Sequence, residues 1–415
     1  MGFQPPRGMA DIGPEEMLTR EWVYSRIKSV FKRYGFRLVE PSFVEEFETL
    51  SAKSGEEIRN EIYDFKDKSG RELGLRFDLT VGCSRMVAAN PNWQKPVKLA
   101  CISSMWRYDR PGYGRKRWFY QWNVEVFGVD GAEADAEVIA LSIDILDELG
   151  LKGCEVLVGN REIAEDILQK AGVKQIDGAL RTIDKIKKVS KEELYREFGK
   201  YGVDKKTADS VLEKLRAKNL AGLKKEKVKG VESLEKVFEY LGKLGKKAEL
   251  DLTVVRGIGY YTGVVFEAYE NGNPNLGALF GGGRYDSLVK IFSGKDMPAT
   301  GCAGGIERAL MALESQKKVP DFKGEKSIFV VPVGPDVLGE AIGIASALRE
   351  TGLSASYDIA GRKLSKNLEW ANSNSVSYCI IVGKRDLEEK KVTVRNMETG
   401  DEKKVELKKI AEFFA

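Results

Sequence analysis

The chain has 415 residues, of which 42% are hydrophobic and 31% charged, so we expect two or three globular domains rather than one core. Lys and Arg number 67 against 63 Asp and Glu, and a net charge of +4 identifies no partner by itself. The chain contains no histidine, which excludes Ser-His-Asp catalysis and metal sites with histidine ligands.

No stretch approaches the about 18 uncharged apolar residues that cross a bilayer, and the first residues, MGFQPPRGMADIG, contain no apolar signal core. We therefore expect a cytoplasmic protein without a membrane partner. The five cysteines stand at wide spacings without a CxxC pair, so we predict neither a disulfide framework nor a thiolate metal site.

The first block, residues 11–130, begins with the helical pattern EEMLTREWVYSRIKSVFKRYG. Extended runs follow, such as FRLVEPSFVE and KPVKLACISSMWRY. Consecutive strands with few intervening helices favour an antiparallel sheet. In LGLRFDLTVGCSRM, Asp78 and Thr80 stand two residues apart, so we predict that they share one strand face and can hold an ammonium group. Such a pair is also common on ordinary exposed strands.

The segment WRYDRPGYGRKRWFYQWNVEVFG is an arginine-rich hairpin, with Arg107, Arg110, Arg115 and Arg117 around its turn. Arginine binds phosphate through two hydrogen bonds and stays charged, so this hairpin suits a triphosphate. An exposed hairpin with solvated arginines is the alternative. The return strand carries Gln121, Asn123 and Glu125 at every second position among apolar residues, which predicts the polar floor of a pocket.

Residues 181–230 hold 16 basic and 8 acidic residues, whereas the rest of the chain has a net charge of −4. Stretches such as EELYREFGKYG and KKTADSVLEKLRAKNL are typical of helices, so we predict a helical insert with a basic face. A solvated lysine-rich surface and a grip on nucleic acid are about equally consistent with it.

The third block, residues 248–314, again indicates strands. In LDLTVVRGIGYYTGVVFEAYE we predict an apolar strand before Arg256, whose guanidinium needs an anionic partner if buried, either a ligand phosphate or a structural Asp. In LFGGGRYDSL the three glycines would let the backbone approach a ligand closely, but a tight turn is the commoner explanation. In GCAGGIERAL we predict that a glycine-rich strand delivers Arg308 to the start of a helix. No Walker loop is present.

After the polar junction SQKKVPDFKGEK the pattern changes to alternating strands and helices, beginning with SIFVVPVG and AIGIASALRETG. This alternation predicts a separate α/β domain of about 90 residues with a mostly parallel sheet.

Taken in order, these motifs resemble a class II aminoacyl-tRNA synthetase, specifically the histidyl-tRNA synthetases. RGMADIGPEE is similar to the family's opening, and GFRLVEPSFVE to class motif one. The arginine hairpin is similar to motif two, and GCAGGIER to motif three. VVRGIGYYTGVVFE and FGGGRYD resemble the two stretches that separate histidyl enzymes from their prolyl, threonyl and glycyl relatives.

The resemblance implies an α+β fold: an antiparallel-sheet catalytic domain in two parts, residues 1–170 and 246–320, with a helical insertion domain at 171–245 that contacts the tRNA acceptor arm. It implies an α/β anticodon-binding domain at 325–415. It further implies a homodimer that charges histidine tRNA with L-histidine, using ATP as a substrate with Mg²⁺ on the phosphates and no protein-bound metal.

The resemblance also assigns site residues. Arg107 would bind the α-phosphate of ATP, Asp109 would lie near the adenine, and Arg115 and Arg308 would hold the outer phosphates. Arg256 would contact both the α-phosphate and the amino-acid carboxylate. The implied histidine-binding residues are Asp78, Thr80 and Gln121 at the ammonium group, Glu125 and Tyr261 at the imidazole, and in addition Tyr260 and Tyr285.

Two residues depart from the family pattern. Gly259 stands where the family has Asp in the run Arg-Gly-Leu-Asp-Tyr-Tyr, and Asp109 replaces the more usual Glu. Three other functions agree with part of the pattern: a synthetase-like regulatory subunit that charges no tRNA, a general RNA-binding module, and a sister synthetase for Pro, Thr or Gly. The complete set of arginines and the anticodon-type domain disfavour the first two.

Overall fold

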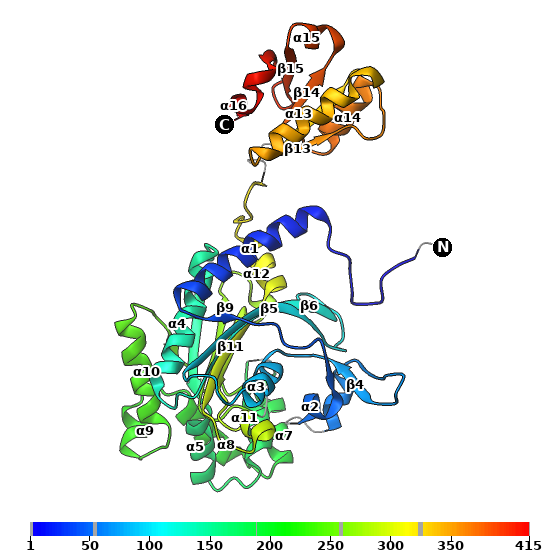
Figure 1. Ribbon diagram of the computed structural model, residues 1–415. Helices are drawn as coiled ribbons and strands as arrows, with labels where there is room; N and C mark the ends of the chain where they lie inside the picture. Colours follow the sequence, from blue (N-terminus) through cyan, green and yellow to red (C-terminus); the bar gives the residue numbers. More distant parts are fainter. Residues whose placement is uncertain (1–2, 53–55, 188, 257–259, 323–326, 415) are drawn as a thin grey trace. The chain divides into compact units, whose positions relative to one another are not determined.

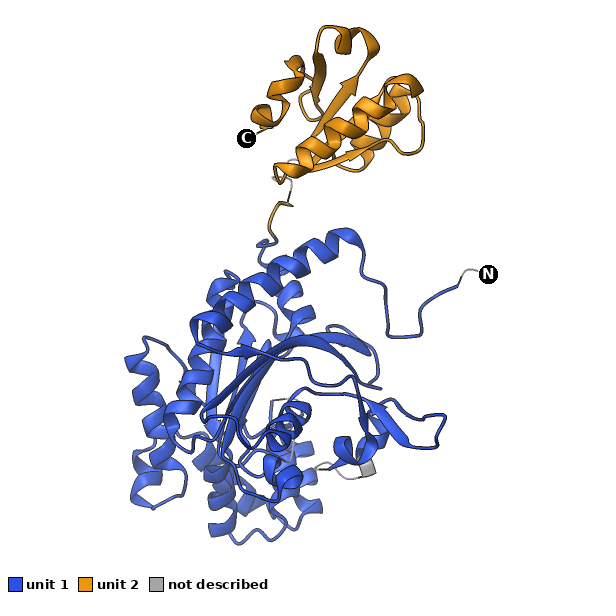
Figure 2. Cartoon of the chain, in the orientation of Figure 1, with its two compact units in different colours: residues 1–319 blue, residues 320–415 orange. Residues whose placement is uncertain are grey.

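The computed structural model describes residues 3–52, 56–187, 189–256, 260–322 and 327–414 (Figure 1). It divides into two compact units, Met1–Val319 and Pro320–Ala415 (Figure 2). The predicted start of the last domain, residue 325, lies outside the described residues.

The first unit is built on an eight-stranded sheet in the order β1-β5-β6-β11-β10-β9-β7-β8, whose inner pairs are antiparallel and whose edge strands β1 and β8 pair in parallel. The predicted antiparallel sheet is confirmed. Strands from before and after the insert pair directly, because β11 lies beside β6 and β9 beside β7. The strands are β1 (Arg37–Leu38), β5 (Val97–Trp106), β6 (Trp118–Phe127), β7 (Cys154–Asn160), β8 (Glu249–Leu250), β9 (Val264–Glu270), β10 (Phe280–Arg284) and β11 (Ala299–Gly305).

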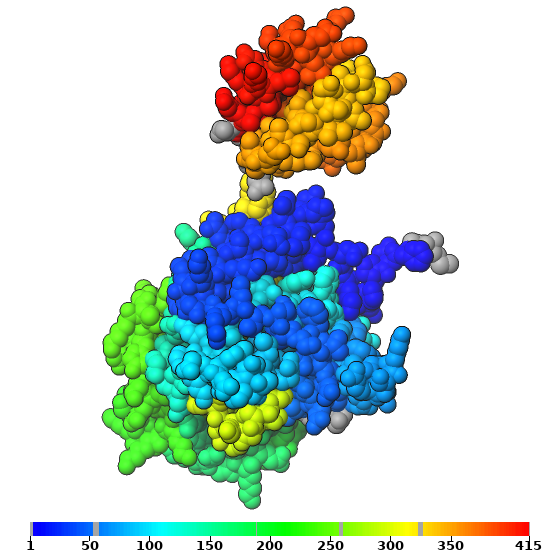
Figure 3. Space-filling view, in the orientation of Figure 1, coloured from blue at the N-terminus to red at the C-terminus, as the bar shows by residue number. Residues whose placement is uncertain are grey.

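The sheet packs helices on both faces. Along β6, Trp122 and Val124 belong to the core shared with α1, α4, α5 and α12, whereas Phe127 belongs to the core shared with α3 and α11. Side chains alternate along a strand, so the residues at odd positions share the face of Phe127. Gln121, Asn123 and Glu125 therefore face the α3–α11 side. Helices α3 and α11 lie side by side there (Figures 1 and 3). The helices are α1 (Pro14–Arg33), α3 (Thr80–Ala89), α4 (Ala132–Glu148), α5 (Arg161–Lys170), α11 (Leu288–Ser293) and α12 (Ile306–Ser315).

A small sheet, β2-β4-β3, precedes α3 and corrects one prediction. Its strand β4 ends at Leu75 and α3 begins at Thr80, so Asp78 and Thr80 do not share a strand face. The Asp78 carboxylate accepts the backbone N–H of Val81 at 3.0 Å, and this local bond favours the helix start over a continued strand. The elements are β2 (Val44–Glu46), α2 (Phe47–Ser51), η1 (Glu56–Asn60), β3 (Asp64–Lys66) and β4 (Glu72–Leu75).

The basic segment between β7 and β8 is helical, as predicted. The side chains of Ser190 and Asp204 cap α7 and α8 by accepting backbone N–H groups. The apolar faces of these helices join the same core as the sheet, and the segment lies inside the first unit. The division into an insertion domain at 171–245 stays a prediction. The helices are α6 (Ile176–Ile183), α7 (Lys191–Lys200), α8 (Lys205–Leu215), α9 (Ala221–Lys225) and α10 (Val231–Lys243).

The second unit is an α/β domain with a five-stranded sheet in the order β13-β12-β14-β15-β16. The first three strands are parallel, as predicted, and the last two form an antiparallel hairpin. No helix in the described part of the chain is long and apolar enough to cross a bilayer. The elements are β12 (Ser327–Pro332), α13 (Leu338–Glu350), β13 (Ser354–Tyr357), α14 (Leu364–Ser373), β14 (Tyr378–Val382), α15 (Lys384–Glu388), β15 (Lys391–Asn396), β16 (Glu402–Glu406) and α16 (Ile410–Phe414).

Candidate active site

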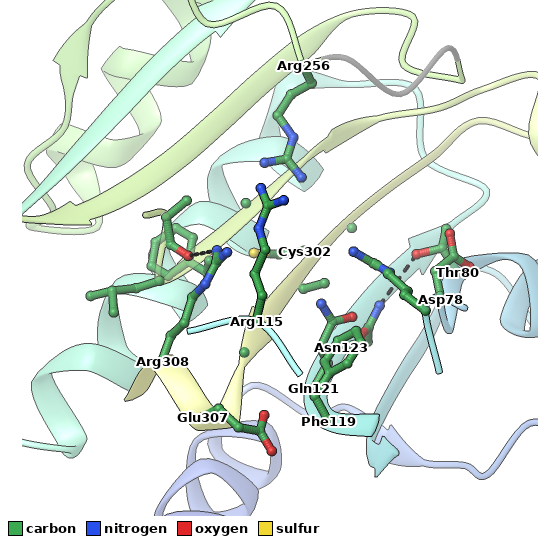
Figure 4. Close-up of a pocket in the computed structure, with 18 of the residues that line it drawn as sticks. Asp78, Thr80, Arg115, Phe119, Gln121, Asn123, Arg256, Cys302, Glu307 and Arg308 are labelled. Atoms are coloured by element: carbon green, nitrogen blue, oxygen red, sulfur yellow. Dashed lines mark hydrogen bonds between the residues drawn. The ribbon is translucent and has the colours of Figure 1, made fainter. Parts of the chain in front are cut away.

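A pocket of about 290 Å³ opens over the strands β6, β10 and β11. Its walls also come from the arginine hairpin, the start of α3, the loop before β9 and the start of α12 (Figure 4). Except for Glu125, every residue that the sequence assigned to the site lines this pocket. These residues are Asp78, Thr80, Arg107, Asp109, Arg115, Gln121, Arg256, Tyr260, Tyr261, Tyr285 and Arg308.

Four arginines from three separate segments line this pocket: Arg107 and Arg115 of the hairpin, Arg256 and Arg308. The side chains of Arg115 and Arg256 point toward one another, with Arg308 beside them (Figure 4). Backbone carbonyls fix two members of the cluster: Arg107 Nε donates to Phe77 at 2.9 Å, and Arg308 Nη1 donates to Ala278 at 2.6 Å. As predicted, β11 ends at Gly305 and α12 starts at once, so the helix start presents Arg308 to the pocket.

The electrostatics of Arg308 show how close these cations are. Its pKa is lowered from the ordinary arginine value, first by burial and then by the positive charges of Arg115, Arg107 and Arg256. Like charges repel at such short range, and the repulsion is relieved when an anion binds among them. This part of the pocket is therefore built to receive a polyanion.

Arg256 has a carboxylate partner. Its Nη1 donates to Glu267 on β9. The predicted need for an anionic partner is thus met within the chain by a Glu, where a ligand phosphate or a structural Asp was expected. Burial opposes the charge of Arg256, but Tyr261 and Glu267 outweigh this effect and raise the pKa of the guanidinium above its ordinary value. Gly259, the predicted departure from the family pattern, lies outside the described residues.

The segment before Arg256 is not the apolar strand that we predicted. Strand β8 ends at Leu250, and the side chain of Asp251 then accepts both the N–H and the hydroxyl of Thr253, at 2.9 and 2.5 Å. A backbone bond from Val254 N–H to the Asp251 carbonyl closes the turn. These local hydrogen bonds form a turn in place of a paired strand, and Arg256 follows shortly after this turn.

The three glycines at 281–283 form the central strand β10, so the predicted tight turn is wrong. Close approach explains the residue type: a Cβ on Gly281 would lie 2.3 Å from Arg256 Nη1, and one on Gly282 would lie 2.1 Å from the Gly301 carbonyl. On the neighbouring strand β11, a Cβ on Gly301 would lie 1.6 Å from Glu125 Oε2. Both glycine-rich strands thus make room for side chains of the site.

Glu125 lies behind the wall of the pocket, with 1% of its surface exposed. Thr80 donates its hydroxyl to Oε1 at 2.6 Å, Asn123 donates to the same oxygen at 3.3 Å, and the Tyr285 hydroxyl donates to Oε2. Burial raises the pKa of Glu125 to about 7, although these three hydrogen bonds pull the other way. Glu125 is not among the described residues that line the pocket, and its role at the imidazole stays a prediction. Thr80 and Tyr285, which both bind this carboxylate, line the pocket themselves.

Two buried acceptors at this end of the pocket have no hydrogen-bond partner among the described residues: Asp78 Oδ2 and Asn123 Oδ1. Burial raises the pKa of Asp78. Unpaired buried acceptors cost free energy, and a bound donor group removes that cost. The arrangement suits a ligand group with several N–H donors.

Some arginines of the predicted motifs do not belong to the site. Arg117 stacks on Tyr108 at 3.9 Å from the ring centre and, like Arg110, does not line the pocket. Arg284 is buried against Asp135 at 2.9 Å and ties β10 to α4. Its role is structural.

Sequence reasoning missed several residues of the site. Phe119 lines the pocket and lies under Arg107, with 5.2 Å between the guanidinium carbon and the ring centre. It stands two positions before Gln121, so the alternation of β6 already indicated its face. Glu307 also lines the pocket and accepts both the Tyr120 N–H and a buried Arg20 of α1, at 3.0 and 3.1 Å. Partners so far apart in sequence give no local signal.

No group of three or more Cys, Asp or Glu side chains in the described ranges is placed to hold a metal ion. The cysteines are free thiols in this structure; Cys83, Cys101, Cys302 and Cys379 are buried, and Cys154 is partly buried.

Comparison with known proteins places these observations in one family. The family model "Histidyl-tRNA synthetase" matches residues 8–309, and the model "Anticodon binding domain" matches residues 327–415. A histidine–tRNA ligase from Pyrococcus abyssi is 38% identical over 96% of this chain and 95% of its own.

Solved structures agree with this match. The histidyl-tRNA synthetase from Nostoc sp. PCC 7120 superposes with a TM-score of 0.84 at 24% identity, covering 100% of this chain and 99% of its own, which shows the fold. A protein from Bacillus halodurans C, described as an ATP phosphoribosyltransferase regulatory subunit/histidyl-tRNA synthetase, has a TM-score of 0.69 at 26% identity, covering 89% and 96%.

Proposed function

The chain belongs to the histidyl-tRNA synthetase family, and from this premise we propose that it joins L-histidine to the 3′ end of histidine tRNA in two steps, of which the first consumes ATP. In the first step a carboxylate oxygen of histidine attacks the α-phosphorus of ATP and pyrophosphate leaves. In the second step the histidyl group passes from the adenylate to a hydroxyl of the tRNA.

The observation that carries the first step is the group of converging arginines. Arg107 and Arg256 bind the α-phosphate, where negative charge builds up as the bonds exchange, while Arg115 and Arg308 hold the outer phosphates. Asp109 lies near the adenine. Fixed cations at the reacting phosphorus lower the barrier, and loss of one such contact typically costs about 3–4 kcal/mol. The lowered pKa of Arg308 beside three other arginines supports this assignment.

The acceptor end of the same pocket binds the histidine. Asp78, Thr80 and Gln121 hold the ammonium group, which supplies a donor to the unpaired Oδ2 of Asp78. Asn123, with its own unpaired Oδ1, joins them. An ammonium group near these acceptors and a carboxylate near Arg256 orient the amino acid for attack on the phosphorus.

The aromatic wall and Glu125 read the imidazole. Tyr260 packs at a tilt against Tyr261, with 4.8 Å between ring centres, and edge-to-face against Tyr285, with 5.8 Å. Tyr261 offers a hydroxyl to one ring nitrogen. Glu125 reaches the other when one of its present bonds to Thr80 or Tyr285 opens. A site that leaves such polar groups unpaired with the wrong side chain discriminates by about 10⁴-fold or more.

No side chain is needed as the base in the second step. An oxygen of the adenylate phosphate accepts the proton of the tRNA hydroxyl as the ester bond forms and the phosphate ester leaves. This route is compatible with a chain that contains no histidine. ATP enters as its Mg²⁺ complex, and the ion neutralises the outer phosphates as part of the substrate.

The tRNA contacts two parts of the chain in this proposal. The anticodon binds the second unit, whose residues 327–415 match the anticodon-binding family, and the acceptor arm binds the helical segment between β7 and β8. Several lysines of that segment are already ion-paired, such as Lys185 with Glu197 and Lys224 with Glu235. Such pairs weaken the basic face, so the RNA grip depends on the remaining positive charges.

We place the enzyme in the cytoplasm, where translation occurs, and propose that it is a homodimer. Support for the dimer comes from the motif-one segment, where the large apolar side chains of Leu38, Phe43 and Val44 are exposed within a few residues. Analytical ultracentrifugation tests this: one sedimenting species of twice the chain mass is expected, and a monomer at micromolar concentration contradicts it.

An ATP–pyrophosphate exchange assay with each of the twenty amino acids tests the proposed function. We expect exchange with L-histidine alone, followed by charging of histidine tRNA. Exchange with proline, threonine or glycine instead identifies a sister synthetase. Histidine binding without any exchange identifies a regulatory subunit.

A further inference from the structure

Glu267 is a partly buried carboxylate beside the site, with 17% of its side chain exposed, and the proposed reaction assigns it no role. It lies on β9 directly opposite Gly281 of β10, and both residues face the α3–α11 side of the sheet. Its Oε1 accepts Arg256 Nη1, and its Oε2 accepts the hydroxyl of Tyr269 from the same strand. Glu267 is not among the described residues that line the pocket, so it meets the site only through Arg256.

The guanidinium of Arg256 is confined on two sides. Glu267 binds one edge, and the bare backbone of Gly281 lies against the same nitrogen, at a place where a Cβ would be 2.3 Å away. A guanidinium has five N–H donors, and this clasp occupies one end of the group. The remaining edge is directed into the pocket, toward Arg115 (Figure 4).

The backbone at Arg256 also requires such support. Its φ angle is 56°, in the left-handed region that residues with a Cβ rarely occupy, at a cost on the order of 1–3 kcal/mol. The turn at Asp251 fixes the chain that enters this position. An ion pair with Glu267 at the other end of the side chain then sets the direction of the guanidinium.

Tyr269 fixes the carboxylate in turn. Burial, and then the neighbouring Glu267, raise the pKa of Tyr269 above its ordinary value, so its hydroxyl stays protonated and can only donate to Glu267. Tyr269 therefore orients Glu267, and Glu267 in turn orients Arg256.

We propose that Glu267 is a positioning residue for histidine activation: its carboxylate, oriented by Tyr269, holds the Arg256 guanidinium where the α-phosphate of ATP and the carboxylate of histidine meet. This inference rests on the proposed function. It assigns a role to a residue that touches neither substrate.

Charge and geometry predict opposite effects at this residue, which makes the proposal testable. If Glu267 served only as a counterion, its removal would leave more positive charge in the pocket and would tighten the binding of ATP. If it positions Arg256, its removal lowers the activation rate while the Michaelis constant for ATP changes little, because a misplaced guanidinium still attracts phosphate.

The test measures kcat and KM for ATP in histidine-dependent pyrophosphate exchange. For Glu267→Gln we expect a fall in kcat of about 10- to 100-fold with KM for ATP within about threefold of wild type. For Tyr269→Phe we expect a smaller fall in kcat, of about three- to tenfold. The matched control is Glu270→Gln, which alters a buried carboxylate of the same strand that binds Ser315 and Gln316 instead; it is expected to retain wild-type kcat within about twofold.

A double-mutant cycle shows whether Glu267 acts through Arg256. In the Arg256→Ala background, the change Glu267→Gln is expected to alter kcat by less than about twofold, because the group that it orients is gone. Wild-type kcat in Glu267→Gln, or an equal loss with and without Arg256, overturns the proposal.

Two further measurements keep the test decisive. If circular dichroism shows that Glu267→Gln does not fold, Gly281→Ala replaces it, because the added Cβ would lie 2.3 Å from Arg256 Nη1 and displaces the guanidinium while Glu267 is retained. The same fall in kcat is expected, whereas wild-type kcat contradicts the proposal. Exchange by the wild-type enzyme separates the two levels of inference. A wild type without histidine-dependent exchange refutes the proposed function, and an active wild type with fully active variants refutes the role of Glu267 alone.

Discussion

The two ends of the pocket are incomplete in opposite ways. At the arginine end, cations from distant segments face one another, and their mutual repulsion lowers the pKa of Arg308. At the other end, the buried oxygens Asp78 Oδ2 and Asn123 Oδ1 have no donor among the described residues. An amino acid carries both missing groups, a carboxylate and an ammonium. This difference between the two ends indicates how the amino acid is oriented, with its carboxylate toward the arginines and its ammonium group toward the unpaired oxygens.

The largest effect is expected at the arginine end. Arg256→Ala removes a cation from the reacting phosphorus and is expected to lower kcat for pyrophosphate exchange by about 10²- to 10³-fold, with a much smaller rise in KM for ATP. Arg110→Ala is the control, because Arg110 is an exposed arginine of the hairpin that does not line the pocket. A rise in KM with unchanged kcat would make Arg256 a binding residue only.

The next prediction concerns the charge state of the opposite end. Glu125 has its pKa raised to about 7 in the folded protein by burial, so the folded state binds a proton more tightly than the unfolded state does. Stability is then lost as the pH rises from about 4.5 to about 7, by an amount on the order of 3 kcal/mol. Glu125→Gln has no such titration.

Urea unfolding of wild type and Glu125→Gln at pH 5 and pH 8 measures this difference. The variant is expected to gain free energy of unfolding relative to wild type on going from pH 5 to pH 8. A difference between the two proteins that is the same at both pH values contradicts the assignment of the titration to Glu125.

A substitution that displaces the Glu125 carboxylate tests whether the histidine-binding end of the pocket must be in place before the substrate binds. Gly301→Ala places a methyl group 1.6 Å from the position of Glu125 Oε2, so the carboxylate has to move. Histidine-dependent exchange is expected to fall by about 10- to 100-fold, mainly through KM for histidine. Gly112→Ala, whose added Cβ meets nothing within 4 Å, serves as the control. Equal activity of the two variants would contradict a role of the Glu125 position in histidine binding.

The smallest effect is expected outside the pocket. Lys225 is an exposed residue at the end of α9. Lys225→Glu is expected to raise KM for histidine tRNA by about two- to fivefold. The rate of pyrophosphate exchange is expected to stay unchanged, because exchange involves no RNA. The exchange rate of the same variant is the internal control. Unchanged charging kinetics would favour a merely solvated surface at this position.

Local patterns predicted what depends on neighbouring residues. The spacing of Gln121, Asn123 and Glu125 gave their common face, and the glycines before Arg308 gave the junction of a strand and a helix. The family resemblance supplied the roles, which remain proposals.

Contacts between distant segments were beyond local reasoning. The partner of Arg256 is Glu267 on the following strand, where a ligand phosphate or a structural Asp was expected. The local bond from Val81 N–H to Asp78 also ended a predicted strand, because alternation alone does not show where a helix begins. The glycines of β10 suggested a turn, because nothing nearby in the sequence shows that a strand needs glycine there. The need arises only because the side chain of Arg256 lies against the strand backbone. Glu125 was placed on the correct face, but the residues that cover it come from other elements.

A crystal structure of the protein with ATP and histidinol tests the central claim most directly, because histidinol carries an alcohol in place of the carboxylate and cannot be activated in the same way. The account predicts the α-phosphate within hydrogen-bonding distance of Arg107 and Arg256, the outer phosphates at Arg115 and Arg308, and the ammonium group at Asp78. Phosphates bound elsewhere, with these guanidinium groups turned away from them, would contradict it.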